Sequence, residues 1–157
     1  MMLADMARFC TGQDGEGKTG LLCVDTTFEL TSDGYWLTDT AYENKALIDK
    51  NGKHPFFPGP SMWHFRKDQQ EYRHFAATLL EYVPALTEMG EVGHDLDKAL
   101  ANGFQDIYPS SINKWCTQHI QRRDAERLAE IRVGEINKTK IMTDIYGSQT
   151  GKFFYST

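Results

Sequence analysis

The sequence has 157 residues, of which 40% are hydrophobic, 12% aromatic and 25% charged. These values predict one compact domain with a single core and argue against a disordered chain. Seventeen basic and 22 acidic residues give a net charge of −5, which argues against coating of nucleic acid through bulk positive charge. The apolar runs are too short for a membrane span or a secretion signal. Three widely spaced cysteines favour a reducing, intracellular compartment.

The first half of the chain indicates a flexible lead-in followed by strands. Residues 1–20 are expected to form an irregular lead-in, because residues 11–20 are Gly-rich and show no period. Strands are expected at 21–30, 35–48 and 56–65, separated by the turn signals Ser32-Asp33-Gly34 and Asn51-Gly52. These three strands predict an antiparallel meander.

The second half alternates helices with strands. Apolar residues at helical spacing predict a helix that begins after an N-cap at Asp68 and ends at Pro84. A strand at 89–94, a helix at 96–107, a strand at 112–119, a helix at 120–133 closed by Gly134 and a short helix near 141–146 follow. The order β-β-β-α-β-α-β-α predicts an α/β protein with a five-stranded mixed sheet and helices on its faces.

Positive charge is concentrated between Lys114 and Lys140, where seven basic and four acidic residues give +3 against −8 for the rest. Such a segment can form a local basic face that meets phosphates. Interleaved charges of this kind are also typical of a solvated helix, and the pattern alone favours that interpretation.

The segment GQDGEGKT, from Gly12 to Thr19, matches the phosphate-loop pattern G-x-x-x-x-G-K-[ST]. A working loop of this type follows a strand and opens a helix whose N-terminus binds phosphate. Here a strand is expected to follow instead, and the carboxylates of Asp14 and Glu16 would repel phosphate. We therefore expect no nucleotide site at Gly12 to Thr19.

Two aspartates are candidate metal ligands. Asp25 lies inside an apolar strand, where a charged residue needs a partner or a metal. Asp95 follows the expected strand 89–94. If the two strands are neighbours, both carboxylates lie at one end of the sheet and can hold the cations used in phosphoryl transfer. A polar neighbour of Asp25 and an N-cap role for Asp95 are the structural alternatives.

Cysteine, histidine and tryptophan give weaker signals. Cys116-x-x-His119 supplies half of a zinc site, and no spacing ties it to Cys10, Cys23 or His94, so a packing role is the preferred interpretation. His54, His64 and His74 form no constellation. Trp36, Trp63 and Trp115 are expected in the core or on a sheet face, with base stacking as the alternative use.

Several of these stretches, taken in order, resemble the transposase domain of Mutator-like elements, the MULE family. The resemblance extends over about residues 21–151. The matching stretches are VDTTFEL (24–30), HP (54–55), GP (59–60), WHFRK (63–67), Tyr72, Phe75, GHD (93–95), AL (99–100), Phe104, CTQH (116–119) and DIYG (144–147).

The resemblance implies a ribonuclease-H-like core over residues 21–157 and metal-dependent DNA strand cleavage and transfer in transposition. It places the first two acids of the catalytic triad, which bind Mg²⁺ or Mn²⁺, at Asp25 and Asp95, and the family's Cys-x-x-His pair at Cys116 and His119. It also implies DNA as the partner, possible homo-oligomers, no membrane association and a nuclear location.

The sequence departs from the family pattern in two places. Leu96-Asp97 stands where the family has Gly-Glu, and no acid maps onto the third triad position, although Glu126, Glu130 and Glu135 occupy the last helices. We therefore expect a partial core that binds DNA weakly and is nearly inactive by itself. The alternative is a domesticated or decayed copy with a non-catalytic role in DNA binding or assembly.

Overall fold

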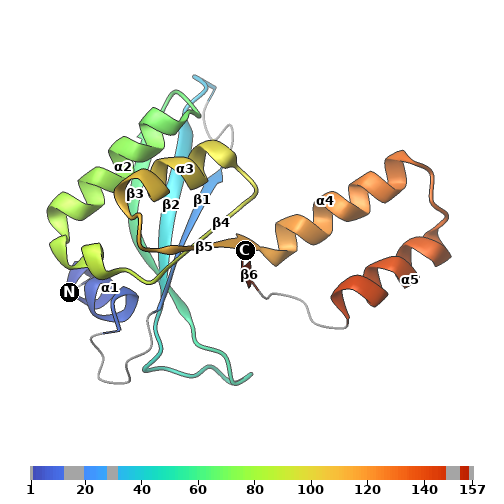
Figure 1. The fold of residues 1–157 in the computed structure, drawn as a ribbon, viewed down its shortest axis with the longest axis horizontal. Helices are drawn as coiled ribbons and strands as arrows, with labels where there is room; N and C mark the ends of the chain where they lie inside the picture. The colour runs from blue at the N-terminus through green and yellow to red at the C-terminus, as the bar shows by residue number, and fades with distance from the viewer. Residues whose placement is uncertain (1, 13–19, 28–31, 148–152, 156–157) are drawn as a thin grey trace.

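The computed structural model describes residues 2–12, 20–27, 32–147 and 153–155. These residues form a mixed sheet with helices packed on one face and a helical pair beyond one edge (Figure 1). The elements are, in chain order, α1 (Met2–Cys10), β1 (Leu21–Thr27), β2 (Trp36–Glu43), β3 (Phe56–His64), α2 (Gln69–Tyr82), the 3-10 helix η1 (Pro84–Glu88), β4 (Glu91–His94), α3 (Lys98–Ile107), β5 (Ile112–Cys116), α4 (Thr117–Glu130), α5 (Glu135–Tyr146) and β6 (Phe153–Tyr155).

The strands lie in the order β3-β2-β1-β4-β5-β6. Strands β1, β2 and β3 form the predicted antiparallel meander, while β4 and β5 run parallel to β1. The predicted mixed α/β sheet is therefore confirmed. Strand β6, which the sequence analysis did not predict, pairs antiparallel with β5.

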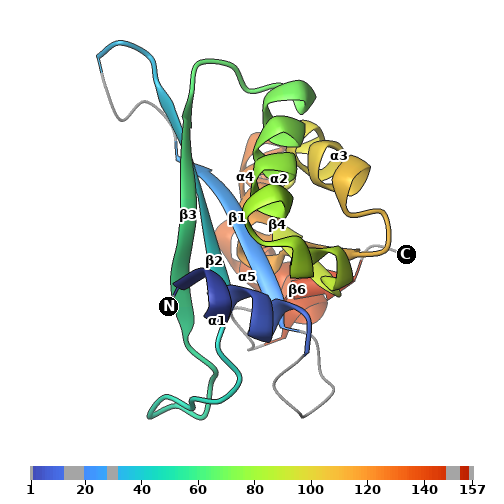
Figure 2. The same cartoon turned by 90° about the vertical axis from the view of Figure 1, so that its left-hand side faces the viewer.

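The two faces of the sheet differ in what covers them. Side chains at alternate positions of β1, such as Leu22 and Val24, are buried with Val92 of β4 in one hydrophobic core. Helices α1, α2 and α3 lie on this side (Figure 2). The intervening positions Asp25 and Thr27 are exposed on the opposite face, which we call the open face.

The expected irregular lead-in is wrong for residues 2–10, which form α1. Met6, Phe9 and Cys10 recur at helical spacing and are buried in the core, and the Phe9 ring stacks on that of Tyr42. The helix was not predicted because it is only nine residues long and lies directly before the Gly-rich stretch. Burial raises the pKa of the Cys10 thiol to about 12, so it behaves as a small apolar side chain.

The helix α2 begins and ends as predicted. The Asp68 carboxylate accepts a hydrogen bond from the Glu71 backbone N–H at 3.0 Å, and Pro84 follows the helix. Helix α3 packs closely on α2 at Gly103, where a Cβ would lie 2.8 Å from both the Arg73 nitrogen and the Tyr72 Cβ. Only glycine allows this approach of the two helices.

The predicted boundary between β5 and α4 is displaced. The strand ends at Cys116, because Thr117, Gln118 and His119 already belong to the first turn of α4. The prediction that Gly134 closes α4 is wrong. Gly134 has a φ of −61° and is the N-cap of α5, and the residue with a positive φ after α4 is Arg132, at 59°.

Helices α4 and α5 form an arm that projects beyond β5 (Figure 1). The Tyr146 hydroxyl donates a hydrogen bond to the Asp124 carboxylate across the pair. Partial burial, together with that carboxylate, raises the Tyr146 pKa to about 12. No residue of α5 is buried, so the arm presents most of its surface to solvent. Within the described residues, no helix is both long and apolar enough to cross a membrane.

Candidate functional site

Asp25 is near the end of the central strand β1. The strand alternates between faces, so the buried neighbours Val24 and Thr26 place Asp25 on the open face. One carboxylate oxygen, Oδ1, accepts a hydrogen bond from the Thr26 backbone N–H at 3.0 Å. The second carboxylate oxygen of Asp25 is therefore the one available to a ligand.

Asp95 follows β4 on the neighbouring parallel strand. Val24 pairs with His94, so Asp25 and Asp95 come next on their two strands. The predicted adjacency of the two strands is confirmed. The antiparallel register also places Asp39 of β2 directly opposite Asp25. Sequence reasoning missed Asp39, although counting back from the hairpin turn could have indicated it.

The N-cap alternative for Asp95 is wrong. The cap of α3 is Asp97, whose Oδ1 accepts hydrogen bonds from the Ala99 and Leu100 backbone N–H groups at 2.8 and 3.4 Å. Asp95 accepts instead from the Asp97 backbone N–H, at 2.9 Å. The same Asp97 carboxylate pairs with Lys67 at 2.9 Å. Asp95 is thus not needed to start the helix, and this leaves it available for another role.

The protein disfavours the charged form of Asp25. Loss of hydration raises its pKa above the ordinary value of 3.8, and the nearby negative charge of Asp95 raises it further. The positive charges of His119 and Arg122, and the hydrogen bond from Thr26, act in the opposite direction. Asp25 and Asp95 thus form a like-charged pair beside two basic side chains. A bound cation would offset the negative charges of the pair, and a bound phosphate would offset the positive charges of the basic side chains.

Helix α4 brings basic side chains to this pair. His119 and Arg122, three residues apart, line a cavity of about 200 Å³ together with Asp95 and Glu126. The His119 Nδ1 atom is buried without a hydrogen-bond partner among the described residues. Arg122 was missed in the sequence analysis. Its spacing after the Cys-x-x-His motif, on the same helix face as His119, is the signal that could have found it.

The residues fit a single hard cation better than two. No group of three or more His, Cys, Asp or Glu side chains in the described part of the chain could hold a metal ion. Asp25 and Asp95 are two oxygen donors on adjacent strands, and Mg²⁺ in proteins often takes only one or two carboxylates and keeps several waters.

The three candidate third acids are placed differently. Glu126 lines the cavity with Asp95, and its carboxylate lies 4.0 Å from Arg122. Glu130 pairs with Arg127 at 2.8 Å, and Glu135 begins α5. Of the three, Glu126 is therefore the one that shares a cavity with Asp95.

Among the residues that the structure describes, no further ligands join Cys116 and His119 in a zinc site. Cys10 is buried in the core on the other face of the sheet. The buried His94 ring is held by the Asp95 carbonyl at 2.6 Å and by Asn113 Oδ1 at 3.2 Å. Burial raises the pKa of the Cys23 thiol, and Cys116 lies close enough for its charge to raise the Cys23 pKa further. All three cysteines are free. The packing interpretation of the motif agrees with this arrangement.

The phosphate-loop pattern lies mostly outside the described residues, which resume at Gly20. Its flanks are the helix α1, which ends at Cys10, and the strand β1, which begins at Leu21. This is the reverse of the strand–loop–helix order that a phosphate site needs, and it agrees with the prediction that a strand follows the motif.

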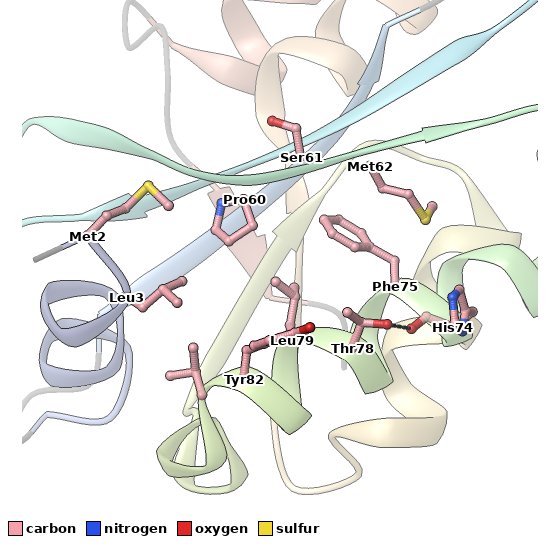
Figure 3. A pocket seen from close by; sticks show the side chains of 11 residues that line it. Met2, Leu3, Pro60, Ser61, Met62, His74, Phe75, Thr78, Leu79 and Tyr82 are labelled. Carbon is pink, nitrogen blue, oxygen red and sulfur yellow. Dashed lines mark hydrogen bonds between the residues drawn. The ribbon is translucent and has the colours of Figure 1, made fainter.

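A second cavity, of about 380 Å³, lies on the helix-covered side between α1, β3 and α2 (Figure 3). Its lining is mainly apolar, with Leu3, Met62 and Phe75 facing it. The Thr78 hydroxyl in the lining donates a hydrogen bond to the His74 backbone carbonyl. It contains no acidic side chain and lies on the face opposite to Asp25. It is therefore separate from the candidate site.

No protein-family model matches this sequence, and no curated protein is significantly similar to it.

Proposed function

We propose that the chain is a ribonuclease-H-like core related to the MULE transposases, and that its Asp25 and Asp95 edge engages a DNA phosphodiester. The observation that carries this proposal is the register of β1 and β4, which brings the two aspartates next to each other at one end of the sheet. The effect of the Asp95 charge, which raises the pKa of Asp25, agrees with that placement.

The topology supports the same proposal. An antiparallel β1-β2-β3 unit, extended by parallel β4 and β5 with a helix before each, is the arrangement that the resemblance implies. The acids lie where β1 and β4 end, the usual place for a ligand in such a sheet.

In this proposal Asp25 and Asp95 bind one Mg²⁺ or Mn²⁺ through their free oxygens. The bound ion supplies activation of water and stabilisation of a leaving phosphate oxygen. Arg122 lies beside the pair, where its positive charge attracts a phosphate group. His119 in the same cavity offers a second polar contact.

Cleavage by residues 1–157 alone is expected to be absent or slow, because the described residues include no group of three or more His, Cys, Asp or Glu side chains that could hold a metal ion. DNA binding is expected to be weak because the net charge is −5 and only the 114–140 segment carries an excess of positive charge, part of it in ion pairs. Lys114 contacts Glu91 at 2.7 Å, Arg127 contacts Glu130 at 2.8 Å and Lys138 contacts Glu135 at 3.8 Å. Few phosphates are then neutralised, so the salt dependence of binding is shallow.

A non-catalytic domesticated domain is the second candidate. His119 and Arg122 already offset part of the charge on Asp25, so the acid can be a structural partner of α4. In that case divalent cations would not alter DNA binding.

The test measures the affinity for a short DNA duplex with Mn²⁺ and with EDTA, and nicking of supercoiled plasmid in parallel. We expect Mn²⁺ to strengthen binding by the wild-type chain, with little nicking. Asp25→Asn and Asp95→Asn should lose the Mn²⁺ effect, whereas Asp33→Asn in an exposed turn should keep it.

Equal affinity with Mn²⁺ and EDTA would overturn the proposal and favour the non-catalytic domain. Robust nicking that both variants abolish would instead contradict the expected inactivity. It would identify Glu126 as the first acid to substitute, because Glu126 lines the cavity with Asp95.

A further inference from the structure

Three aromatic rings cluster at the open end of the β2–β3 hairpin, where β2 begins and β3 ends. The rings of Tyr35 and Phe65 have centroids 3.8 Å apart with a tilt of 40°, and Trp63 meets Tyr35 edge-on at 6.5 Å. We call these three residues the aromatic cluster. Trp36 pairs with His64, so Tyr35 and Phe65 are the next two residues opposite each other on the hairpin.

The aromatic cluster belongs to the open face. Trp63 pairs with Leu37, which in turn pairs with Thr27, two residues beyond Asp25 on the same side of β1. The partly buried Met62 and the fully buried Thr38 occupy the opposite side. Two strand spacings and two residues separate Trp63 from Asp25, which is about 10 Å across the sheet and about 7 Å along it.

Packing in the hydrophobic core does not account for the positions of Trp63 and Phe65, because both rings are largely exposed. Trp63 is 56% exposed and Phe65 is 61% exposed. The other two tryptophans have neighbours that account for them: Trp36 lies under the Lys67 ammonium at 5.7 Å, and Trp115 packs on the His94 ring at 5.9 Å. Exposed aromatic rings grouped in this way are typical of binding surfaces.

Charge beside the cluster favours a nucleic acid. Arg66 follows Phe65 directly and its side chain is 73% exposed. Its ion pairs with Asp68 and Glu71, at 4.0 and 3.5 Å, are long and solvent-exposed, so they hold the guanidinium weakly. A phosphate that reaches Arg66 can therefore compete for it.

We propose that the aromatic cluster binds unpaired bases of a single DNA strand whose backbone continues toward Asp25 and Asp95. This inference rests on the proposed function, because it names the form of DNA that the same face receives. Rings stack on any base, and Arg66 is placed for the adjoining phosphate. Apart from Leu37, the residues between the cluster and the acids, Thr27, Asp39 and Ser61, are polar and disfavour a protein partner, whose interface would have an apolar centre.

The experiment measures binding of a fluorescently labelled oligothymidine strand and of a matched duplex, by anisotropy in EDTA, so that the carboxylate pair is not required. We expect the single strand to bind more tightly than the duplex. Trp63→Ala should weaken single-strand binding by roughly 5- to 150-fold, the range for loss of one stacked base. Trp63→Phe should restore most of the affinity, because a ring remains.

Two controls keep the result specific. Tyr82→Ala removes a ring that is 71% exposed on α2, away from the cluster, and should leave affinity unchanged. Phe65→Ala should weaken binding in the same direction as Trp63→Ala, which guards against a folding defect in one variant. Circular dichroism of each variant checks the fold.

Equal affinity of Trp63→Ala and the wild-type chain would overturn the inference, as would equal binding of strand and duplex. Concentration-dependent self-association that Trp63→Ala abolishes, without single-strand binding, would also overturn it and indicate a protein interface. Since the assay contains EDTA, its failure is distinct from failure of the Mn²⁺ effect that tests the proposed function.

Discussion

Asp25 is a candidate site residue in a setting that disfavours its charged form. Its side chain is on the open face, yet neighbouring atoms and Asp95 hinder its ionisation, and only part of this is offset by His119 and Arg122. Charged groups kept in an unfavourable setting are common where binding or catalysis needs them. The same residue predicts a specific dependence of stability on pH.

Asp25→Asn should raise the melting temperature at pH 7, in EDTA. The pKa of Asp25 in the folded chain lies above its ordinary value of 3.8, so the charged form weakens the folded state at neutral pH. As the pH falls through the folded pKa, the acid takes up a proton and this penalty declines. Below 3.8 both states are protonated, and the advantage of the variant should disappear.

Thermal unfolding of both proteins between pH 3 and pH 8 (roughly the span over which an aspartate with a raised pKa titrates) checks this prediction. Asp33→Asn, which removes the same charge from an exposed turn, is the control. A gain that grows on acidification would contradict the argument, because it would mean that ionised Asp25 stabilises the fold.

At the scale of elements, the sequence predicts those whose signals are long or chemically specific. Helix α2 has a capping aspartate, a repeated apolar face and a terminal proline, and its limits agree with prediction. Helix α1 is only nine residues long and lies beside a Gly-rich stretch, and the sequence analysis did not predict it. Its burial against Tyr42 is a tertiary effect that local sequence does not encode.

Phe9→Ala tests whether α1 belongs to the core. Phe9 is buried and its ring stacks on Tyr42, so removal should lower the free energy of unfolding by about 3–5 kcal/mol. Ile136→Ala on α5, where the side chain is 87% exposed, should change it by less than about 0.5 kcal/mol. Chemical denaturation measures both. A near-neutral Phe9→Ala would mean that α1 is not docked on the sheet in solution.

For the molecule as a whole, the alternation of strands and helices was enough to predict the mixed sheet, whereas the adjacency of β1 and β4 was a condition of the site hypothesis that the sheet order meets. The candidate pair Asp25 and Asp95 follows from that adjacency. Asp39 and Trp63 could not be assigned in the same way, because their positions depend on hairpin register and on which face the helices leave open. Sequence alternation shows that a strand has two faces, but it does not show which face is covered.

The most direct test of the central claim is a count of bound Mn²⁺ by electron paramagnetic resonance, in which free Mn²⁺ gives the signal and bound Mn²⁺ loses it. We expect the wild-type chain to bind a single Mn²⁺ ion, through the two carboxylates that the β1–β4 register brings together. Asp25→Asn and Asp95→Asn should each abolish this binding, and Asp33→Asn should preserve it. Binding that survives both substitutions, or no binding by the wild-type chain, would contradict the claim that Asp25 and Asp95 form a cation site.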